Sequence, residues 1–190
     1  MKTRYPHAYV VNVLSDDHPG IIAAVSGVIV TLQGNIDACS QTVLGGFFTQ
    51  ILVVSFPAAV AADKLAGMIR VSQGGEGLQV VAREYQPPAA PTQKSGTETF
   101  VITAFGKDKP GIIYRLSQYL AGKDINVVDL YWDTKVEDFV LVAQVEIPQQ
   151  WEIRMLQADL EEMAAEQGFA CRVQHENIFV ATNQLRLTGH

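Results

Sequence analysis

The chain repeats itself at an offset of 91 residues, and this internal repeat constrains the fold more than any other feature of the sequence. Residues 15–57 align with residues 106–148 without a gap. The shared turn reads SDDHPGII at residues 15–22 and GKDKPGII at residues 106–113. Ten positions are identical: Asp17/Asp108, Pro19/Pro110, Gly20/Gly111, Ile21/Ile112, Ile22/Ile113, Ser26/Ser117, Asn35/Asn126, Phe48/Phe139, Val54/Val145 and Pro57/Pro148. Because turn residues and apolar spacing recur together, we predict two copies of one folding unit.

Each copy predicts a strand before the shared turn and an amphipathic helix after it. The preceding runs, AYVVNVL and TFVITAF, are rich in β-branched and aromatic residues. Pro19 and Pro110 suit the first turn of a helix. Apolar residues then recur with helical spacing, at positions 21, 22, 25, 28 and 29 and, in register, at 112, 113, 116, 119 and 120.

The rest of each copy predicts two strands, a second helix and a final strand. Gly45-Gly46 and residues 135–138 are plausible hairpin turns between the two strands. Pro57 and Pro148 are expected to open the second helices, and Gly74, Gly75 and Gly168 to end them. The order in each copy is therefore strand, helix, strand, strand, helix, strand.

This order predicts an α+β protein built from two ferredoxin-like βαββαβ domains in tandem, each an antiparallel sheet with both helices on one face. We place the domains at residues 6–85 and 97–180. Residues 86–96, with three prolines and no apolar period, are predicted to be a semi-extended linker. Residues 181–190 form a polar C-terminal tail.

Composition limits the classes of partner. The 190-residue chain has a net charge of −6 and a pI near 5.1, which argues against direct binding to nucleic acid or anionic lipid. The N-terminus lacks the pattern of a secretory signal, and the longest apolar stretch is too short to span a bilayer, so we expect a cytoplasmic protein without a membrane segment. Cys39 and Cys171 are expected to be reduced packing residues.

The sequence shows no constellation typical of an enzyme or of a metal site. Its four histidines are scattered, and it contains none of the common nucleophile, metal or phosphate-binding motifs. Acidic residues gather near the second hairpin, where a solvated edge explains them: Asp129, Asp133, Glu137 and Asp138. RNA recognition by this topology needs stacked aromatics beside basic residues, and no Lys or Arg precedes Phe47-Phe48. We expect no catalysis, no metal and no cofactor.

The shared turn and the strand that follows the helix are the candidate ligand-binding elements. Gly20 and Gly111 allow close approach at a helix start, where first-turn N–H groups attract a carboxylate. Asn35 and Asn126 each offer a donor and an acceptor. Two ligand sites are therefore predicted, one lined by Asp17, His18, Gly20 and Asn35 and the other by Asp108, Lys109, Gly111 and Asn126. For either copy alone, the turn is equally well explained as helix-start chemistry, and we expect His18 to be exposed because its counterpart is Lys109.

An Asp-x-Pro-Gly-Ile-Ile turn followed fifteen residues after the glycine by Asn-Ile or Asn-Val resembles the ACT domain, a small-molecule-sensing regulatory module. The resemblance implies that an amino acid sits between two domains, touched by the turn of one and the strand of the other. A free-standing tandem of this length resembles the glycine cleavage system transcriptional repressor family. That resemblance implies a response to glycine, action on a partner transcriptional activator and no direct contact with DNA.

The alternative is a protein–protein interaction module in which the repeated turns are structural and no ligand is bound. The sequence does not separate the two functions. In either case, exposed sheet edges would allow the chain to form a homodimer.

Overall fold

A computed structural model describes residues 1–86 and 96–180, and the chain divides into two compact units, Met1–Ala90 and Pro91–His190. The predicted linker, apart from residues 86 and 96, and the predicted tail lie outside the described residues.

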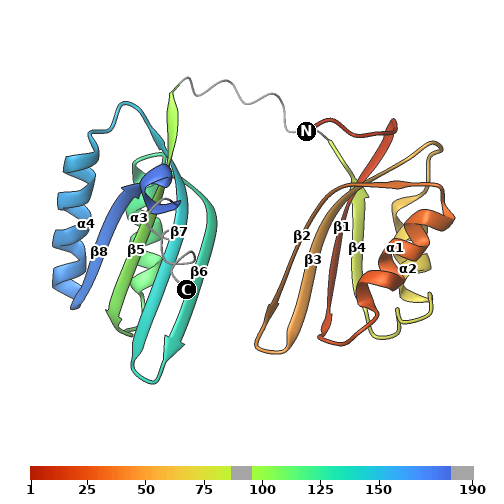
Figure 1. Cartoon of the computed structure of the whole chain (residues 1–190), viewed down its shortest axis with the longest axis horizontal. Coiled ribbons are helices and arrows are strands. Elements are labelled where there is room, and N and C mark those ends of the chain that lie inside the picture. The colour runs from red at the N-terminus through yellow and green to blue at the C-terminus, as the bar shows by residue number, and fades with distance from the viewer. Residues whose placement is uncertain (87–95, 181–190) are drawn as a thin grey trace, which may run out of the picture. The chain divides into compact units, whose positions relative to one another are not determined.

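Unit 1 is a four-stranded antiparallel sheet with two helices on one face (Figure 1). Its elements are β1 (His7–Asp16), α1 (Ile21–Thr31), β2 (Asn35–Leu44), β3 (Phe47–Phe56), α2 (Ala62–Arg70) and β4 (Gln79–Glu84). The strand order is β2-β3-β1-β4, so β2 is an edge strand.

Unit 2 repeats this arrangement (Figure 1). Its elements are β5 (Thr97–Lys107), α3 (Ile112–Gly122), β6 (Asn126–Lys135), β7 (Asp138–Pro148), α4 (Ile153–Gln167) and β8 (Phe169–His175), with strand order β6-β7-β5-β8. Two ferredoxin-like βαββαβ units in tandem confirm the predicted α+β fold class.

Each unit has its own hydrophobic core between sheet and helices. In unit 1 alternate residues of β1, such as Val11 and Val13, are fully buried and pack with Ile21 and Ile29 of α1. In unit 2 Ile102 and Ala104 of β5 take the corresponding places. The alternate apolar residues of the strands and the apolar residues spaced three to four apart along the helices therefore point into the same core layer.

Irregular features recur at the same offset. A register shift lies between Ile36 and Ala38 in β2 and between Val127 and Asp129 in β6. At the two hairpins the backbone is left-handed at Gly45 (φ 60°) and at Val136 (φ 62°). The two units therefore share backbone geometry where their side chains differ.

The ends of several helices differ from the sequence predictions. The caps of α1 and α3 are Gly20 and Gly111, so each proline lies one residue before the cap instead of in the first turn. Helix α2 begins five residues after Pro57 and ends at Arg70, before Gly74. Gly168 does cap α4 in a left-handed conformation (φ 80°), as predicted.

The two cysteines have different environments. Cys171 is buried, and burial raises the pKa of its thiol to about 11. Cys39 lies exposed on edge strand β2, so its prediction as a packing residue was wrong. Cys39 pairs with the buried Leu52 and so faces the helix side of the sheet, and its exposure shows that the helices leave this part of the edge strand uncovered. Within residues 1–86 and 96–180, none of the helices combines the length and apolar character required to cross a membrane.

Candidate ligand-binding site

The shared turn has the same geometry in both units. Gly20 and Gly111 adopt left-handed backbone conformations, with φ of 105° and 96°. The Asp17 N–H donates to the carbonyl of Gly46 at 2.8 Å, and the Asp108 N–H donates to that of Glu137 at 2.7 Å. The neighbouring hairpin therefore holds each turn in place.

A pocket of about 480 Å³ opens at the turn of unit 1, between the start of α1 and the strands β2 and β3. Its lining includes seven of the ten residues that are identical in the two copies: Asp17, Pro19, Gly20, Ile21, Ile22, Ser26 and Phe48. The other three are His18, Ala23 and Gln41. Most of the identity between the copies is therefore concentrated in the lining of one pocket.

Three of the four residues predicted for the first site line this pocket, namely Asp17, His18 and Gly20. His18 is exposed, as expected, and its Nδ1 lies 3.1 Å from the carbonyl oxygen of Pro19. The first helical bond of α1 runs from the Ala24 N–H to the Gly20 carbonyl, at 2.9 Å. The N–H groups of residues 21–23 precede that bond, and the helix itself provides no acceptor for them. The turn thus presents a carboxylate from Asp17 and N–H groups at the positive end of a helix dipole.

The structure does not bring Asn35 to the turn of its own unit. Asn35 begins β2, six residues before Gln41, which corresponds to about 20 Å along a strand. Its Nδ2 donates to Asp37 Oδ1 at 2.8 Å, and the backbone N–H of Arg4 donates to the same oxygen at 2.9 Å. Burial raises the pKa of the Asp37 carboxyl, but hydrogen bonds with Ser55, Arg4 and Asn35 outweigh burial and lower the pKa overall.

In unit 2 one turn residue and one residue of β6 make contacts that have no equivalent among residues 1–86. The Lys109 Nζ donates to the carbonyl of Gln167, at the end of α4, at 2.7 Å. The Trp132 ring stacks on Phe139 with centroids 4.4 Å apart and an interplanar angle of 8°. At the 91-residue offset Trp132 and Phe139 correspond to Gln41 and Phe48. The two predicted sites are therefore not equivalent.

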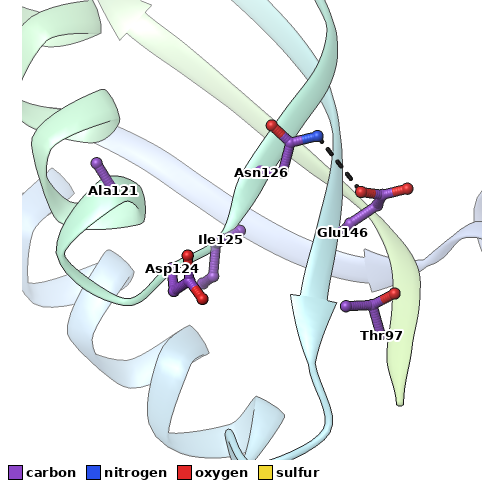
Figure 2. Close-up of a pocket in the computed structure, with 6 residues that line it drawn as sticks. All are labelled: Thr97, Ala121, Asp124, Ile125, Asn126 and Glu146. Atoms are coloured by element: carbon purple, nitrogen blue, oxygen red, sulfur yellow. Dashed lines mark hydrogen bonds between the residues drawn. The ribbon is translucent and has the colours of Figure 1, made fainter. Parts of the chain in front are cut away.

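Asn126 lines a different pocket, of about 460 Å³, together with Thr97, Asp124 and Glu146 (Figure 2). Its Nδ2 donates to Glu146 Oε2 at 3.3 Å, from β6 to the adjacent strand β7. Asp108, Lys109 and Gly111 do not line this pocket. Within unit 2, as within unit 1, the asparagine therefore does not lie at the turn of its own unit.

The corresponding end of unit 1 is covered by the N-terminal segment. The Tyr5 N–H donates to Ser55 Oγ at 3.1 Å, and Ser55 is the counterpart of Glu146. Nothing in the sequence of residues 1–6 indicated this covering role, because it depends on hydrogen bonds to residues 33 and 50 positions away.

The sequence analysis missed the four pocket residues that lie outside the shared turn, namely Ala23, Ser26, Gln41 and Phe48. Ser26 and Phe48 carried a usable signal, because both are identical in the two copies although they lie outside the turn. Across the described ranges, no three His, Cys, Asp or Glu side chains are grouped so as to hold a metal ion.

Comparison with known proteins identifies the family. The ACT domain pattern matches residues 98–174. A UPF0237 protein of Methanococcus maripaludis is 36% identical over 83 residues, which is 43% of this chain and 92% of that protein. A UPF0237 protein of Methanosarcina acetivorans is 27% identical over 81 residues, which is 42% of this chain and 88% of that protein.

Solved structures share the tandem fold. An unknown protein from Galdieria sulphuraria has a TM-score of 0.74 at 21% identity, covering 89% of this chain and 98% of that chain. A candidate glycine cleavage system transcriptional repressor has a TM-score of 0.58 at 16% identity, covering 90% of this chain and 98% of that chain. At these identities the likeness concerns the fold. The protein described here therefore belongs to the family of the UPF0237 proteins and carries an ACT domain at residues 98–174, with two ACT-like units in tandem.

Proposed function

We propose that this protein is an amino-acid-responsive regulator that controls transcription indirectly, through a partner activator protein. The observation that best supports this proposal is the pocket at the turn of unit 1, whose lining contains seven of the ten residues that are identical in the two copies. Glycine is the first candidate effector, because the sequence resembles the glycine cleavage repressor family and a structural neighbour is described as a candidate member.

The chemistry of the pocket suits a zwitterion. The first-turn N–H groups of α1 favour a carboxylate, since they lie at the positive end of the helix dipole. Asp17 lines the same pocket and offers a negative charge for an ammonium group. The pocket volume of about 480 Å³ falls within the range of roughly 300–1,000 Å³ that is typical of small-molecule sites.

Regulation requires that the ligand prefer one state of the protein over another. Tight binding with equal affinity for both states would change nothing downstream. We therefore expect the amino acid to alter the affinity of this chain for its partner, and the partner to alter the affinity for the amino acid by the same factor.

The binding step is tested by calorimetric titration of the intact chain with a panel of amino acids, beginning with glycine. Saturable heat is expected for at least one member, together with a rise in melting temperature, because a ligand specific to the native state stabilises it. Gly20→Val should remove binding by blocking the approach to α1, and folding of the variant is checked by circular dichroism. Absence of heat across the panel at millimolar concentrations would overturn the proposal.

The roles of the asparagines are tested separately with Asn35→Ala and Asn126→Ala. The sequence predicts that both asparagines contribute to ligand binding, in which case each variant should weaken binding while the fold persists. Parental affinity in both variants would remove the asparagines from the site and leave the turn pocket as the remaining candidate.

The transcriptional step is tested in the organism that encodes the chain. Deletion of the gene should raise transcripts of the glycine cleavage genes, and glycine should change them less in the deletion strain than in the parent. The purified chain, with its net charge of −6, should not retard DNA in a gel. Unchanged transcripts in the deletion strain would contradict this role.

An interaction module without a ligand is the second candidate, favoured by exposed apolar residues on the sheet face of unit 1 opposite the helices. Ile51 and Val81 flank Asn12 on that face, and they are 48% and 68% exposed. Clusters of this kind often mark protein-binding surfaces. This candidate predicts that the double variant Ile51→Ser with Val81→Ser no longer regulates the partner protein. It also predicts that amino acids produce no heat when they are titrated into the parent chain.

A further inference from the structure

We propose that the turn pocket of unit 1 accepts a flat aromatic ring, and that Trp132 fills the corresponding pocket of unit 2 from within the chain. The inference rests on the proposed function and specifies its ligand class. Where the family resemblance points to glycine, the pocket of this chain points to an aromatic amino acid. The inference also predicts that each chain binds a ligand at the turn pocket of unit 1 and not at that of unit 2.

The internal repeat provides a matched comparison of the two pockets. Of the residues that line the pocket in unit 1, only His18, Ala23 and Gln41 differ from their counterparts. The counterparts are Lys109, Tyr114 and Trp132. Two of the three differences thus replace a small or flexible side chain by an aromatic one, on an otherwise identical lining.

The register of the strands places Gln41 and Trp132 at equivalent points. Gln41 pairs with Gln50 across β2 and β3, and Trp132 pairs with Leu141 across β6 and β7. Since directly paired residues of antiparallel strands lie on the same face, and Gln50 and Leu141 are both buried, Gln41 and Trp132 both lie on the helix side of their sheets.

The ring of Trp132 shows what the lining accommodates. It is half-buried and stacks on Phe139 with centroids 4.4 Å apart. Phe48, the counterpart of Phe139, is part of the pocket lining in unit 1, and among residues 1–86 and 96–180 no aromatic ring stacks on it. The tryptophan of unit 2 therefore serves as an internal stand-in for the side chain of a ligand in unit 1.

Polar groups at the edge of the pocket suit the rest of such a ligand. Asp17 is available for an ammonium group. Ser26 Oγ donates to the Ile22 carbonyl at 2.7 Å, which leaves its oxygen lone pairs to accept a hydrogen bond. In unit 2 the side chain at the His18 position is engaged elsewhere, since Lys109 Nζ binds the Gln167 carbonyl at 2.7 Å.

The test is calorimetric titration of the intact chain with L-tryptophan, L-phenylalanine and glycine. We expect the aromatic amino acids to bind at one site per chain and at least tenfold more tightly than glycine. Gln41→Trp should fill the pocket and weaken aromatic binding at least tenfold. Thr42→Trp is the matched control, because Thr42 is exposed on the opposite face of β2, and it should bind as the parent does.

The reciprocal variant is Trp132→Gln, checked for folding by circular dichroism, and it should raise the number of aromatic ligands bound from one to two per chain. Binding of glycine without aromatic amino acids, or parental aromatic binding by Gln41→Trp, would overturn this inference and leave the proposed function standing. Failure of every amino acid to bind would overturn the proposed function itself.

Discussion

At the residue scale, the glycines of the shared turn are required by the backbone. Gly20 and Gly111 have φ of 105° and 96°, and an added Cβ at either position would meet no atom within 4 Å. Substitution therefore strains the backbone without a clash. The sequence identified both glycines, because they recur in the motif. It explained the requirement for glycine by the close approach of a ligand, whereas the structure explains it by a left-handed backbone conformation.

We predict that Gly20→Ala and Gly111→Ala each lower the free energy of unfolding by about 1 kcal/mol, the typical cost of a left-handed conformation for a residue with a Cβ. Urea unfolding of each variant measures this loss. Gly27→Ala is the matched control, since Gly27 lies inside α1 with open space around it, and it should leave stability unchanged or raise it by up to about 1 kcal/mol. Equal effects at all three positions would contradict the assignment of strain to the turn.

A second prediction at this scale concerns pH. Hydrogen bonds from Tyr119 (2.9 Å) and Lys123 lower the pKa of the Asp159 carboxyl, with Tyr119 the larger cause. A lowered pKa in the folded state means that the stabilisation is present above the ordinary aspartate pKa of about 3.9 and is lost as the pH falls through the folded-state value. The parent should therefore be more stable than Asp159→Asn at pH 7, and the difference should shrink below about pH 4. Urea unfolding at pH 7, 5 and 3 would show a constant difference if the pairing had no effect.

At the element scale, the junction between α1 and β2 shows why the two copies could differ in sequence without differing in fold. An added Cβ at Gly34 would lie 2.4 Å from Phe56 Cε1. In unit 2 the corresponding residues are Ile125 and Ile147. A glycine beside a phenylalanine in one unit is thus replaced by two isoleucines in the other, so this sequence difference reflects packing.

We predict that Gly34→Ile lowers the free energy of unfolding by about 2–3 kcal/mol through overpacking. The double variant Gly34→Ile with Phe56→Ile should recover at least half of that loss, because it reproduces the pair found in unit 2. A double-mutant cycle by urea unfolding measures the coupling, expected at about 1–2 kcal/mol. Additive losses would contradict the proposed exchange.

The helices and strands that depend on local sequence patterns could be predicted from the sequence. Strand alternation, the period of α1 and α3 and the left-handed cap at Gly168 are local properties, so the order of elements and the fold class were predictable. The start of α2, five residues after Pro57, was not, because an intervening loop carries no distinct signal. The exposure of Cys39 depends on how much of β2 the helix covers, which is a tertiary property.

At the scale of the whole molecule, each unit carries a separate core. We therefore predict that fragments 1–86 and 96–180 fold independently, each with a cooperative thermal transition by circular dichroism. Buried leucine and isoleucine residues in each unit provide the burial that a domain of this size needs. A fragment without a cooperative transition would show that the two units depend on each other.

The candidate site was only partly predictable. The turn and its glycines were visible as a repeated motif, but the grouping of Asn35 with the turn of its own unit required knowledge of the direction of β2. Helix α1 leads the chain away from the turn, so Asn35, the first residue of β2, lies far from it, whereas β2 runs back and brings Gln41 to the pocket beside Phe48 of β3. Such proximity arises from the pairing of strands that are distant in the sequence, and it becomes visible only when the strand order and register of the sheet are known.

The most direct test of the account is nuclear magnetic resonance mapping of amide shifts in the intact chain during titration with glycine, L-phenylalanine and L-tryptophan. A bound amino acid should shift the amides of residues 20–23 together with those of Gln41 and Phe48, and should shift the corresponding residues 111–114 much less. Saturable shifts at the turn of unit 1 would establish the pocket as the ligand site. Shifts confined to other parts of the chain, or none with any of the three, would contradict the claim that this protein senses amino acids at that turn.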